Sequence, residues 1–224
     1  MRVLVSGEGP TDIGGCERAD PCAGEDFMPG PMAWLADQVI EDRLGFSPIG
    51  CGLVHCLSET RLADAAKSLR PPSLRGRRRA KETAFFFRTA REVAAAQDDE
   101  VIAILFRDAD GTQSAARGDW QDKWDSILSG FAWEHFSTGV PMLPCPKSEA
   151  WLICALKRNL PYQHCAQLEQ ASGNDRGKNP LKQQLAAILD GQQNRVVLAD
   201  LVKTRQVCWF SRNRNFALSL LVGR

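Results

Sequence analysis

Short continuous runs of hydrophobic residues alternate with helically spaced segments through the first two-thirds of the chain. The runs have the length of buried strands and lie at residues 3–6, 53–57, 101–106 and 140–143. Helical spacing follows at 32–44, 59–69, 77–99, 119–136 and 148–157. Strands that alternate with helices in this way are typical of a parallel sheet with helices on its faces.

Two parts of the chain depart from this alternation. Residues 14–31 are rich in Gly, Pro and Cys and are expected to form a loop or insertion. Beyond residue 157 the pattern predicts helices only. We therefore expect an α/β domain at 1–157, with the insertion around 14–31 and a basic segment at 70–91, and a helical C-terminal extension at 158–224 packed on it.

Acidic residues follow three of the four expected strands. Glu8 comes after the first, Asp108 and Asp110 after the third, and Glu149 after the fourth, where a helix begins. The carboxyl ends of parallel strands share one edge of the sheet, so these side chains are expected to converge there. Two aspartates at i and i+2 of extended backbone point to the same side and suit Mg²⁺. The alternative is that these acids cap the helices that follow them.

The acids occur in the segments GEGPTD, FRDADG and PKSEAW, which in this order resemble a Toprim domain. The resemblance is closest to the nucleases of the OLD (overcoming lysogenization defect) family and to small stand-alone Toprim-like proteins of bacterial defence loci. It implies a Rossmann-like parallel sheet on which Glu8, Asp108 and Asp110 hold Mg²⁺ or Mn²⁺, with Glu149 completing a second metal position. Asp12 matches a further acid of the family, although Gly14-Gly15 would break the helix that normally begins there.

The activity that the resemblance implies is metal-dependent phosphodiester hydrolysis of DNA or RNA, in anti-phage defence. Glu8, Asp108, Asp110 and Glu149 would be catalytic together with a lysine, and Lys147, Lys178 and Lys182 are the candidates. The chain lacks GxxxxGK[ST], so a partner protein would supply any ATPase. Two alternatives remain: a non-catalytic Toprim-like subunit that binds nucleic acid or a partner protein, and a metal-dependent nucleotide phosphohydrolase or phosphotransferase.

Charge adds a candidate binding surface. Lys and Arg number 28 against 27 Asp and Glu, which excludes a uniformly basic protein but allows the two signs to be segregated. Basic residues gather in the segment 70–91. The residues predicted to contact a nucleic-acid backbone are Arg75, Arg77, Arg78, Arg79 and Lys81, together with Lys178 and Lys182. The alternatives are a solvated helix face and arginines that neutralise the acids within the fold.

The N-terminal hydrophobic run is too short for a signal peptide, and no run approaches the ~20 residues of a membrane span. A cytoplasmic protein without a membrane contact is therefore expected, and the oligomeric state is left open, a dimer included. For the eight cysteines we expect free, mostly buried thiols. An irregular zinc site at Cys16, Cys22, Cys51 and Cys56 is the alternative.

Overall fold

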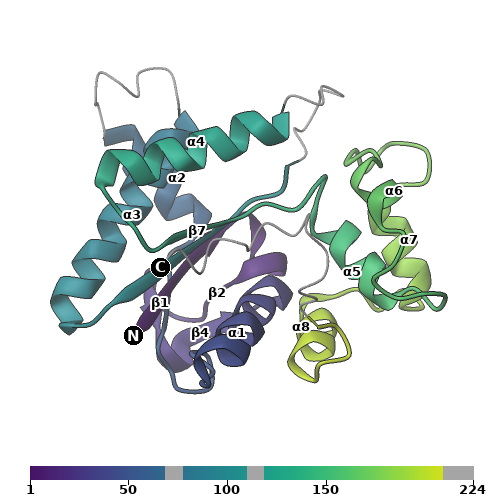
Figure 1. The fold of residues 1–224 in the computed structure, drawn as a ribbon, viewed down its shortest axis with the longest axis horizontal. Helices are drawn as coiled ribbons and strands as arrows, with labels where there is room; N and C mark the ends of the chain where they lie inside the picture. Colours follow the sequence, from purple (N-terminus) through teal and green to yellow (C-terminus); the bar gives the residue numbers. More distant parts are fainter. Residues whose placement is uncertain (69–77, 110–118, 209–224) are drawn as a thin grey trace.

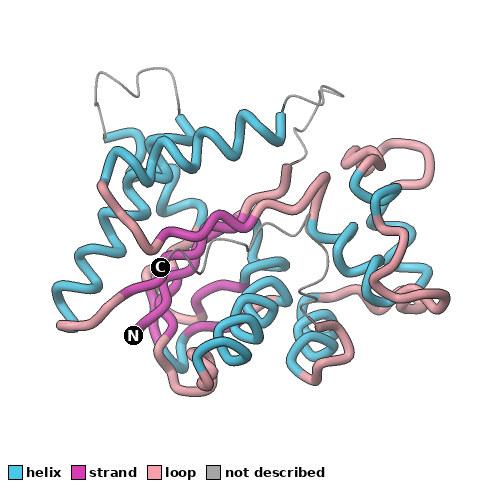
Figure 2. Tube along the Cα trace, in the orientation of Figure 1, coloured by secondary structure: helices cyan, strands magenta, loops and turns pink. Residues whose placement is uncertain are grey.

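The computed structural model describes residues 1–68, 78–109 and 119–208 (Figures 1 and 2). Its strands are β1 (Arg2–Gly7), β2 (Gly14–Cys16), β3 (Cys22–Ala23), β4 (Phe27–Pro29), β5 (Val54–Cys56), β6 (Val101–Phe106) and β7 (Gly139–Met142). Its α-helices are α1 (Pro31–Leu44), α2 (Glu59–Ser68), α3 (Arg78–Gln97), α4 (Asp119–Glu134), α5 (Ser148–Leu156), α6 (Ala166–Glu169), α7 (Leu181–Ile188) and α8 (Arg195–Lys203). A π-helical turn, η1 (Gly9–Ile13), follows β1, and a 3₁₀ turn, η2 (Gly24–Asp26), follows β3.

The main sheet has five strands in the order β3-β5-β1-β6-β7. Strands β5, β1, β6 and β7 are parallel, as expected, whereas the short edge strand β3 runs antiparallel to β5. From β1 the chain passes to β3 and then β5 on one side of it, and later to β6 on the other. The direction of winding therefore reverses between β1 and β6, and ligands of open α/β sheets bind beyond the carboxyl ends of the strands at such a point.

Helices cover both faces of the sheet, so its central strands are hydrophobic throughout. Val3 and Val5 of β1 pack with α1 in one core, which also includes residues of α5, α7 and α8. Leu4, whose side chain points the opposite way, packs in a second core with α2, α3 and α4. Figure 1 shows these two helical layers on opposite sides of the strands.

The C-terminal helices share the core of α1. Gln38 of α1 donates hydrogen bonds from Nε2 to the carbonyl oxygens of Val202, at 2.6 Å, and Val207, at 3.2 Å. Leu181 of α7 and Val202 of α8 are buried in the same core. In Figure 1, α5, α6, α7 and α8 lie grouped to one side of the sheet. The extension is therefore part of the packed structure.

The segment 14–31 is more ordered than the loop that its composition predicts. It contributes an antiparallel pair, β2 with β4, and the edge strand β3. Gly14 has φ +103°, and a Cβ there would lie 2.3 Å from the carbonyl oxygen of Met28. Only glycine fits this close approach of β2 to β4.

The expectation of free cysteines is wrong for four of them. Cys16 is bonded to Cys22, and Cys154 is bonded to Cys165. The spacing of cysteines along a chain does not reveal these pairs, because a disulfide depends on Cα separations of the kind seen here, 5.6 and 5.7 Å. Cys51, Cys56, Cys145 and Cys208 are free thiols.

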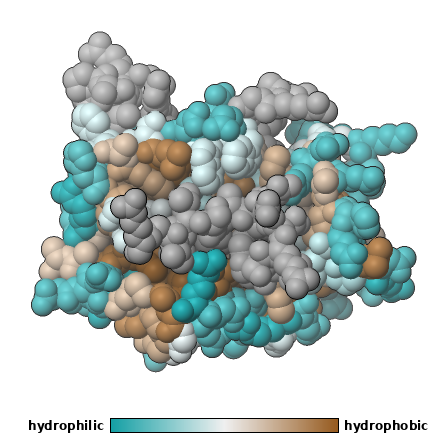
Figure 3. Space-filling model, in the orientation of Figure 1, coloured by the Kyte–Doolittle hydropathy of each residue, from teal (hydrophilic) through white to brown (hydrophobic). Residues whose placement is uncertain are grey.

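The surface drawn in Figure 3 is largely hydrophilic over its right half, with hydrophobic residues gathered in smaller areas on the left. The large hydrophobic side chains that are exposed among the described residues come from separate elements: Met28, Leu44, Trp133, Leu160 and Val196. None of the described helices combines the length and the apolar composition that crossing a bilayer requires.

Candidate active site

Glu8 and Asp12 lie just beyond the carboxyl end of β1. Glu8 precedes the turn η1, and its backbone N–H donates to the Phe106 carbonyl of β6 at 3.3 Å. A Cβ at Gly7 would lie 2.6 Å from that same carbonyl oxygen, so glycine permits this close approach. Asp12 lies inside η1, which ends at Ile13 and is followed by Gly14 with a positive φ of 103°. This single short turn carries Asp12, whose carboxylate contacts Ser148 at the start of α5.

Ser148, the first residue of α5, brings the acids of three segments together. Its hydroxyl donates to Asp12 Oδ1 at 2.5 Å and lies 3.5 Å from Glu149 Oε2. Its backbone N–H donates to Asp108 Oδ1 at 3.0 Å. Ser148 is buried, whereas the three carboxylates are half-buried. Acids that follow β1, β6 and β7 thus all contact one buried serine.

The environment of Asp12 disfavours its negative charge. Burial is the largest cause, and the neighbouring carboxylates of Glu149 and Glu8 add to it, so that the pKa of Asp12 rises to about 6. The hydrogen bond from Ser148 and the positive charge of Lys147 oppose this rise without cancelling it. Excess negative charge in a partly buried cluster favours a cation.

A buried arginine holds Glu8 in place. The Arg107 side chain is only 4% exposed and lies between two carboxylates. Its Nη2 donates to Glu82 Oε2 of α3 at 2.8 Å, and its Nη1 lies 3.5 Å from Glu8 Oε1. The Arg107 Nε is buried and has no hydrogen-bond partner among the described residues. Sequence reasoning missed both Arg107 and Glu82. The sequence does offer one indication for Arg107, because this residue directly follows a buried strand and directly precedes Asp108.

Lys147 is the lysine that the structure places beside the acids. It precedes α5, is buried, and forms a 2.7 Å ion pair through Nζ with Asp175 of the C-terminal extension. Lys178 and Lys182, the other candidates, are exposed. A further lysine that the sequence did not indicate, Lys123 of α4, donates from its buried side chain to the Asp108 carbonyl at 2.6 Å.

Several of the predicted residues lie outside the described part of the chain. Asp110, the second acid of the Asp-x-Asp pair, is one of them, and Arg75 and Arg77 are others. Arg78 and Arg79 begin α3, where the course of the backbone is described. Lys81 is half-buried in the same helix.

Two later arginines of the basic segment are used within the fold. Arg88 and Arg91 pair with the buried Glu134 of α4, at 3.0 and 3.1 Å. Neutralisation of an acid inside the protein therefore accounts for these two residues. Within the basic segment, the candidates for phosphate contact are still Arg75, Arg77, Arg78, Arg79 and Lys81.

The donors at the strand ends are carboxylate oxygens, which Mg²⁺ and Mn²⁺ prefer. Glu8, Asp12, Asp108 and Glu149 would hold such an ion. Among the described residues, however, only Cys16, Cys22 and Cys56 bring three potential ligand atoms within 4.8 Å of one another. The carboxylates must therefore approach further to share one ion. Cys51 is exposed and lies outside the cysteine group, so the structure brings together three of the four cysteines named for the alternative zinc site.

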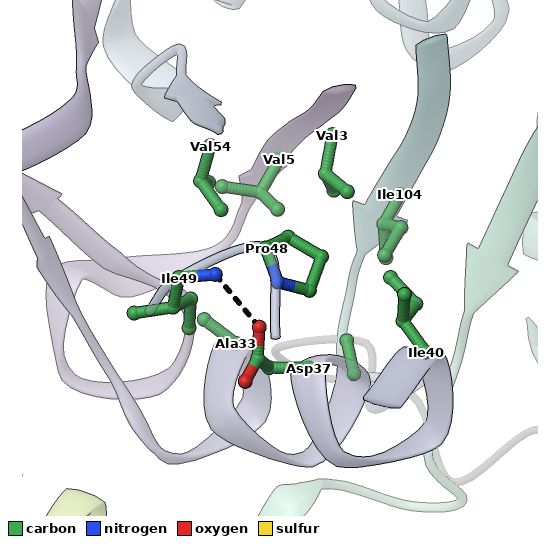
Figure 4. A pocket seen from close by; sticks show the side chains of 10 residues that line it. Val3, Val5, Ala33, Asp37, Ile40, Pro48, Ile49, Val54 and Ile104 are labelled. Carbon is green, nitrogen blue, oxygen red and sulfur yellow. Dashed lines mark hydrogen bonds between the residues drawn. The ribbon is translucent and has the colours of Figure 1, made fainter. Parts of the chain in front are cut away.

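A small cavity, lined by none of these acids, lies between α1 and strands β1, β5 and β6 (Figure 4). Its volume of about 10 Å³ is room for about one water molecule. The Asp37 carboxylate at its edge accepts hydrogen bonds from the Ile49 N–H at 2.8 Å and the Ser47 hydroxyl at 2.6 Å. Burial raises the pKa of Asp37. This aspartate holds the loop after α1, and the cavity is too small for a substrate.

No protein-family model matches the chain, and no curated protein or solved structure matches it either. The case for a function rests on the residues themselves.

Proposed function

We propose that this protein is a divalent-metal-dependent nuclease with a Toprim-like fold. The observation that carries the proposal is the meeting of Asp12, Asp108 and Glu149 around Ser148, at the sheet edge where Glu8 also lies. The raised pKa of Asp12 is what a carboxylate cluster that needs a cation would show. Anti-phage defence and a partner ATPase, which the resemblance implies, remain predictions.

Glu8, Asp12, Asp108 and Glu149 would hold one or two ions of Mg²⁺ or Mn²⁺. When bound, such ions activate water and neutralise charge on a phosphodiester. Ser148 orients the Asp12 and Asp108 carboxylates through its hydroxyl and its backbone N–H. The Lys147 ammonium, fixed by Asp175, supplies a positive charge beside the acids for the phosphate oxygens.

The position of the basic segment favours a nucleic acid over a small nucleotide. Arg107 links Glu8 at the strand ends to Glu82 in α3. Arg78 and Arg79 precede Glu82 in the same helix by about one turn, a rise of roughly 5.4 Å. The start of α3, which carries Arg78 and Arg79, therefore lies close to the acids, and we expect the backbone phosphates of a polymer to extend from one to the other.

Cleavage of plasmid DNA, single-stranded DNA and single-stranded RNA, each with Mg²⁺, Mn²⁺ or EDTA, tests the proposal. We expect cleavage that requires the metal and that Asp108→Ala abolishes. Asp64→Asn, which removes an exposed acid of α2, is the matched control and should cleave as the unmodified protein does. Cleavage that survives Asp108→Ala would contradict the proposal.

The two alternative functions give different results in the same series. A nucleotide phosphohydrolase would release phosphate from nucleoside triphosphates and leave the polymers intact. A non-catalytic subunit would bind nucleic acid or a partner protein without metal-dependent turnover of either substrate. Either result would replace the nuclease proposal.

A further inference from the structure

Three cysteine sulfurs converge beside the carboxyl end of β5, apart from the acids described above. They belong to Cys16 of β2, Cys22 of β3 and Cys56 of β5, and all lie within 4.8 Å of one another. Cys22 and Cys56 are directly opposite in the antiparallel ladder of β3 and β5. Cys22 and Cys56 are buried and Cys16 is half-buried. Cys16 and Cys22 form a disulfide, and Cys56 is a thiol.

The Cys16–Cys22 disulfide does not require the Cys56 sulfur to lie nearby, whereas a zinc site with three thiolate ligands does. In a tetrahedral zinc site with Zn–S bonds of about 2.3 Å, neighbouring sulfurs lie roughly 3.8 Å apart. The Cys56 sulfur, which lies within 4.8 Å of the other two, would have to approach them by about 1 Å or less, and the Cys16 and Cys22 sulfurs would separate from their bonded distance once the disulfide is reduced. The two-residue ladder between β3 and β5 already holds Cys22 opposite Cys56.

We propose that Cys16, Cys22 and Cys56 bind one Zn²⁺ ion when the Cys16–Cys22 disulfide is reduced, with water in the fourth position. An external dithiol gives two electrons and two protons to the S–S bond and becomes a disulfide itself. Zn²⁺ then takes the place of the three thiol protons, which are released to solvent. Thiolates select zinc over Mg²⁺, so this site and the carboxylate cluster take different metals.

The zinc site would join segments that have few other ties. β2 and β3 are three and two residues long and belong to different sheets. A single ion would fasten both to β5, and binding of this kind contributes directly to folding stability. β2 also follows immediately after η1, which carries Asp12. The inference does not rest on the proposed nuclease activity, and its tests measure metal rather than cleavage.

The decisive comparison is between Cys56→Ser and Cys51→Ala. Cys51 lies five positions earlier in the same connection but is exposed and outside the group, so it is the matched control. Protein kept in a thiol-free phosphine reductant is loaded with Zn²⁺, desalted and measured by plasma mass spectrometry. We expect about one zinc ion per chain in the unmodified protein and in Cys51→Ala, and a loss of at least tenfold in affinity in Cys56→Ser. Equal zinc binding in both variants, or none in the unmodified protein, would overturn the inference.

A second measurement uses the unmodified chain, in case Cys56→Ser does not fold. Reduced protein is alkylated with iodoacetamide with and without Zn²⁺, and each cysteine is quantified by peptide mass spectrometry. Zinc should slow alkylation of Cys16 and Cys22 at least tenfold and leave Cys51 unchanged. Co²⁺ in place of Zn²⁺ should give the charge-transfer absorption of cobalt–thiolate bonds. No protection at Cys16 and Cys22 would contradict the site even if every variant misfolds.

Discussion

Ser148 and Asp12 are joined by a 2.5 Å hydrogen bond although 136 positions separate them in the chain. The bond ties the start of α5 to the turn after β1, and the same serine holds Asp108 through its backbone N–H. Ser148 therefore positions carboxylates from two segments at once, without having to contact a substrate itself.

Replacing Ser148 by Ala should lower metal-dependent cleavage about 10- to 100-fold, which is the usual effect of removing a group that orients metal ligands. The loss should appear as a higher metal concentration for half-maximal activity, because the hydroxyl orients Asp12. Ser148→Thr keeps a hydroxyl and should restore much of the activity. Ser129→Ala, which removes a hydroxyl bonded within α4, is the control. A change in substrate KM alone, without a change in metal dependence, would argue against this role.

Asp12→Asn should make the protein more stable at neutral pH. The folded-state pKa of about 6 lies above the ordinary aspartate value of 3.8, so the folded state holds the proton more tightly than the unfolded state. Stability is consequently lost as pH rises from about 4 to about 6, by up to about 3 kcal/mol. Asn carries no such charge and can still accept the Ser148 hydrogen bond.

Urea unfolding of both proteins at pH 3.5 and pH 7.5 measures this effect. The free energies of unfolding should be similar at the lower pH, and the variant should exceed the unmodified protein at the higher pH. A difference between the two proteins that does not change with pH would contradict the assignment to Asp12. The variant should also lose metal-dependent cleavage.

Millimolar Mg²⁺ should raise the melting temperature of the unmodified protein. An ion that binds only the folded state adds about 1.4 kcal/mol of stability at ten times its dissociation constant. Asp64→Asn should respond equally, whereas Asp12→Asn and Asp108→Ala should respond much less. Scanning calorimetry with Mg²⁺ and with matched NaCl separates binding from ionic strength. Equal shifts in all four proteins would mean that the acids do not hold the ion.

Arg107→Ala should destabilise the fold by about 3–5 kcal/mol, because it removes the buried ion-pair partner of Glu82. Arg205→Ala is the comparison. Arg205 also bridges two acids, Glu41 and Asp42, but its side chain is 43% exposed, so we expect a loss of at most about 1 kcal/mol. Denaturant unfolding measures both. Similar losses of unfolding free energy in the two variants would show that burial of the Arg107–Glu82 pair does not determine its contribution to stability.

Replacing Arg77, Arg78 and Arg79 by Ala should weaken nucleic-acid binding and flatten its dependence on salt. Each lost phosphate contact lowers the slope of log K against log salt by about 0.9, so the change should reach about 3 for duplex DNA. Fluorescence anisotropy across a salt series measures the slope. Alanine at the exposed Arg43 and the half-buried Arg195 is the control and should leave it unchanged. An unaltered slope in the triple variant would show that these arginines do not contact the nucleic-acid phosphates.

Local pattern was enough to predict the main elements. The run Val101–Phe106 is hydrophobic at every position because helices cover both faces of β6, and it forms a strand as expected. Ser58 accepts a hydrogen bond from the Arg61 N–H and caps α2 as its position predicts. The composition of 14–31 was less informative, because two- and three-residue strands leave no periodic signal.

Convergence of the acids at one sheet edge follows from their positions after strands, and the sequence alone supports that expectation. Which residues touch was decided by tertiary structure. The contacts of Ser148 with Asp12, Arg107 with Glu82, and Lys147 with Asp175 each join separate elements. The grouping of Cys56 with Cys16 and Cys22 does the same. Hydrophobic periodicity reports only which face of an element is buried, whereas these contacts depend on strand order and on how the helices pack, which no local pattern encodes.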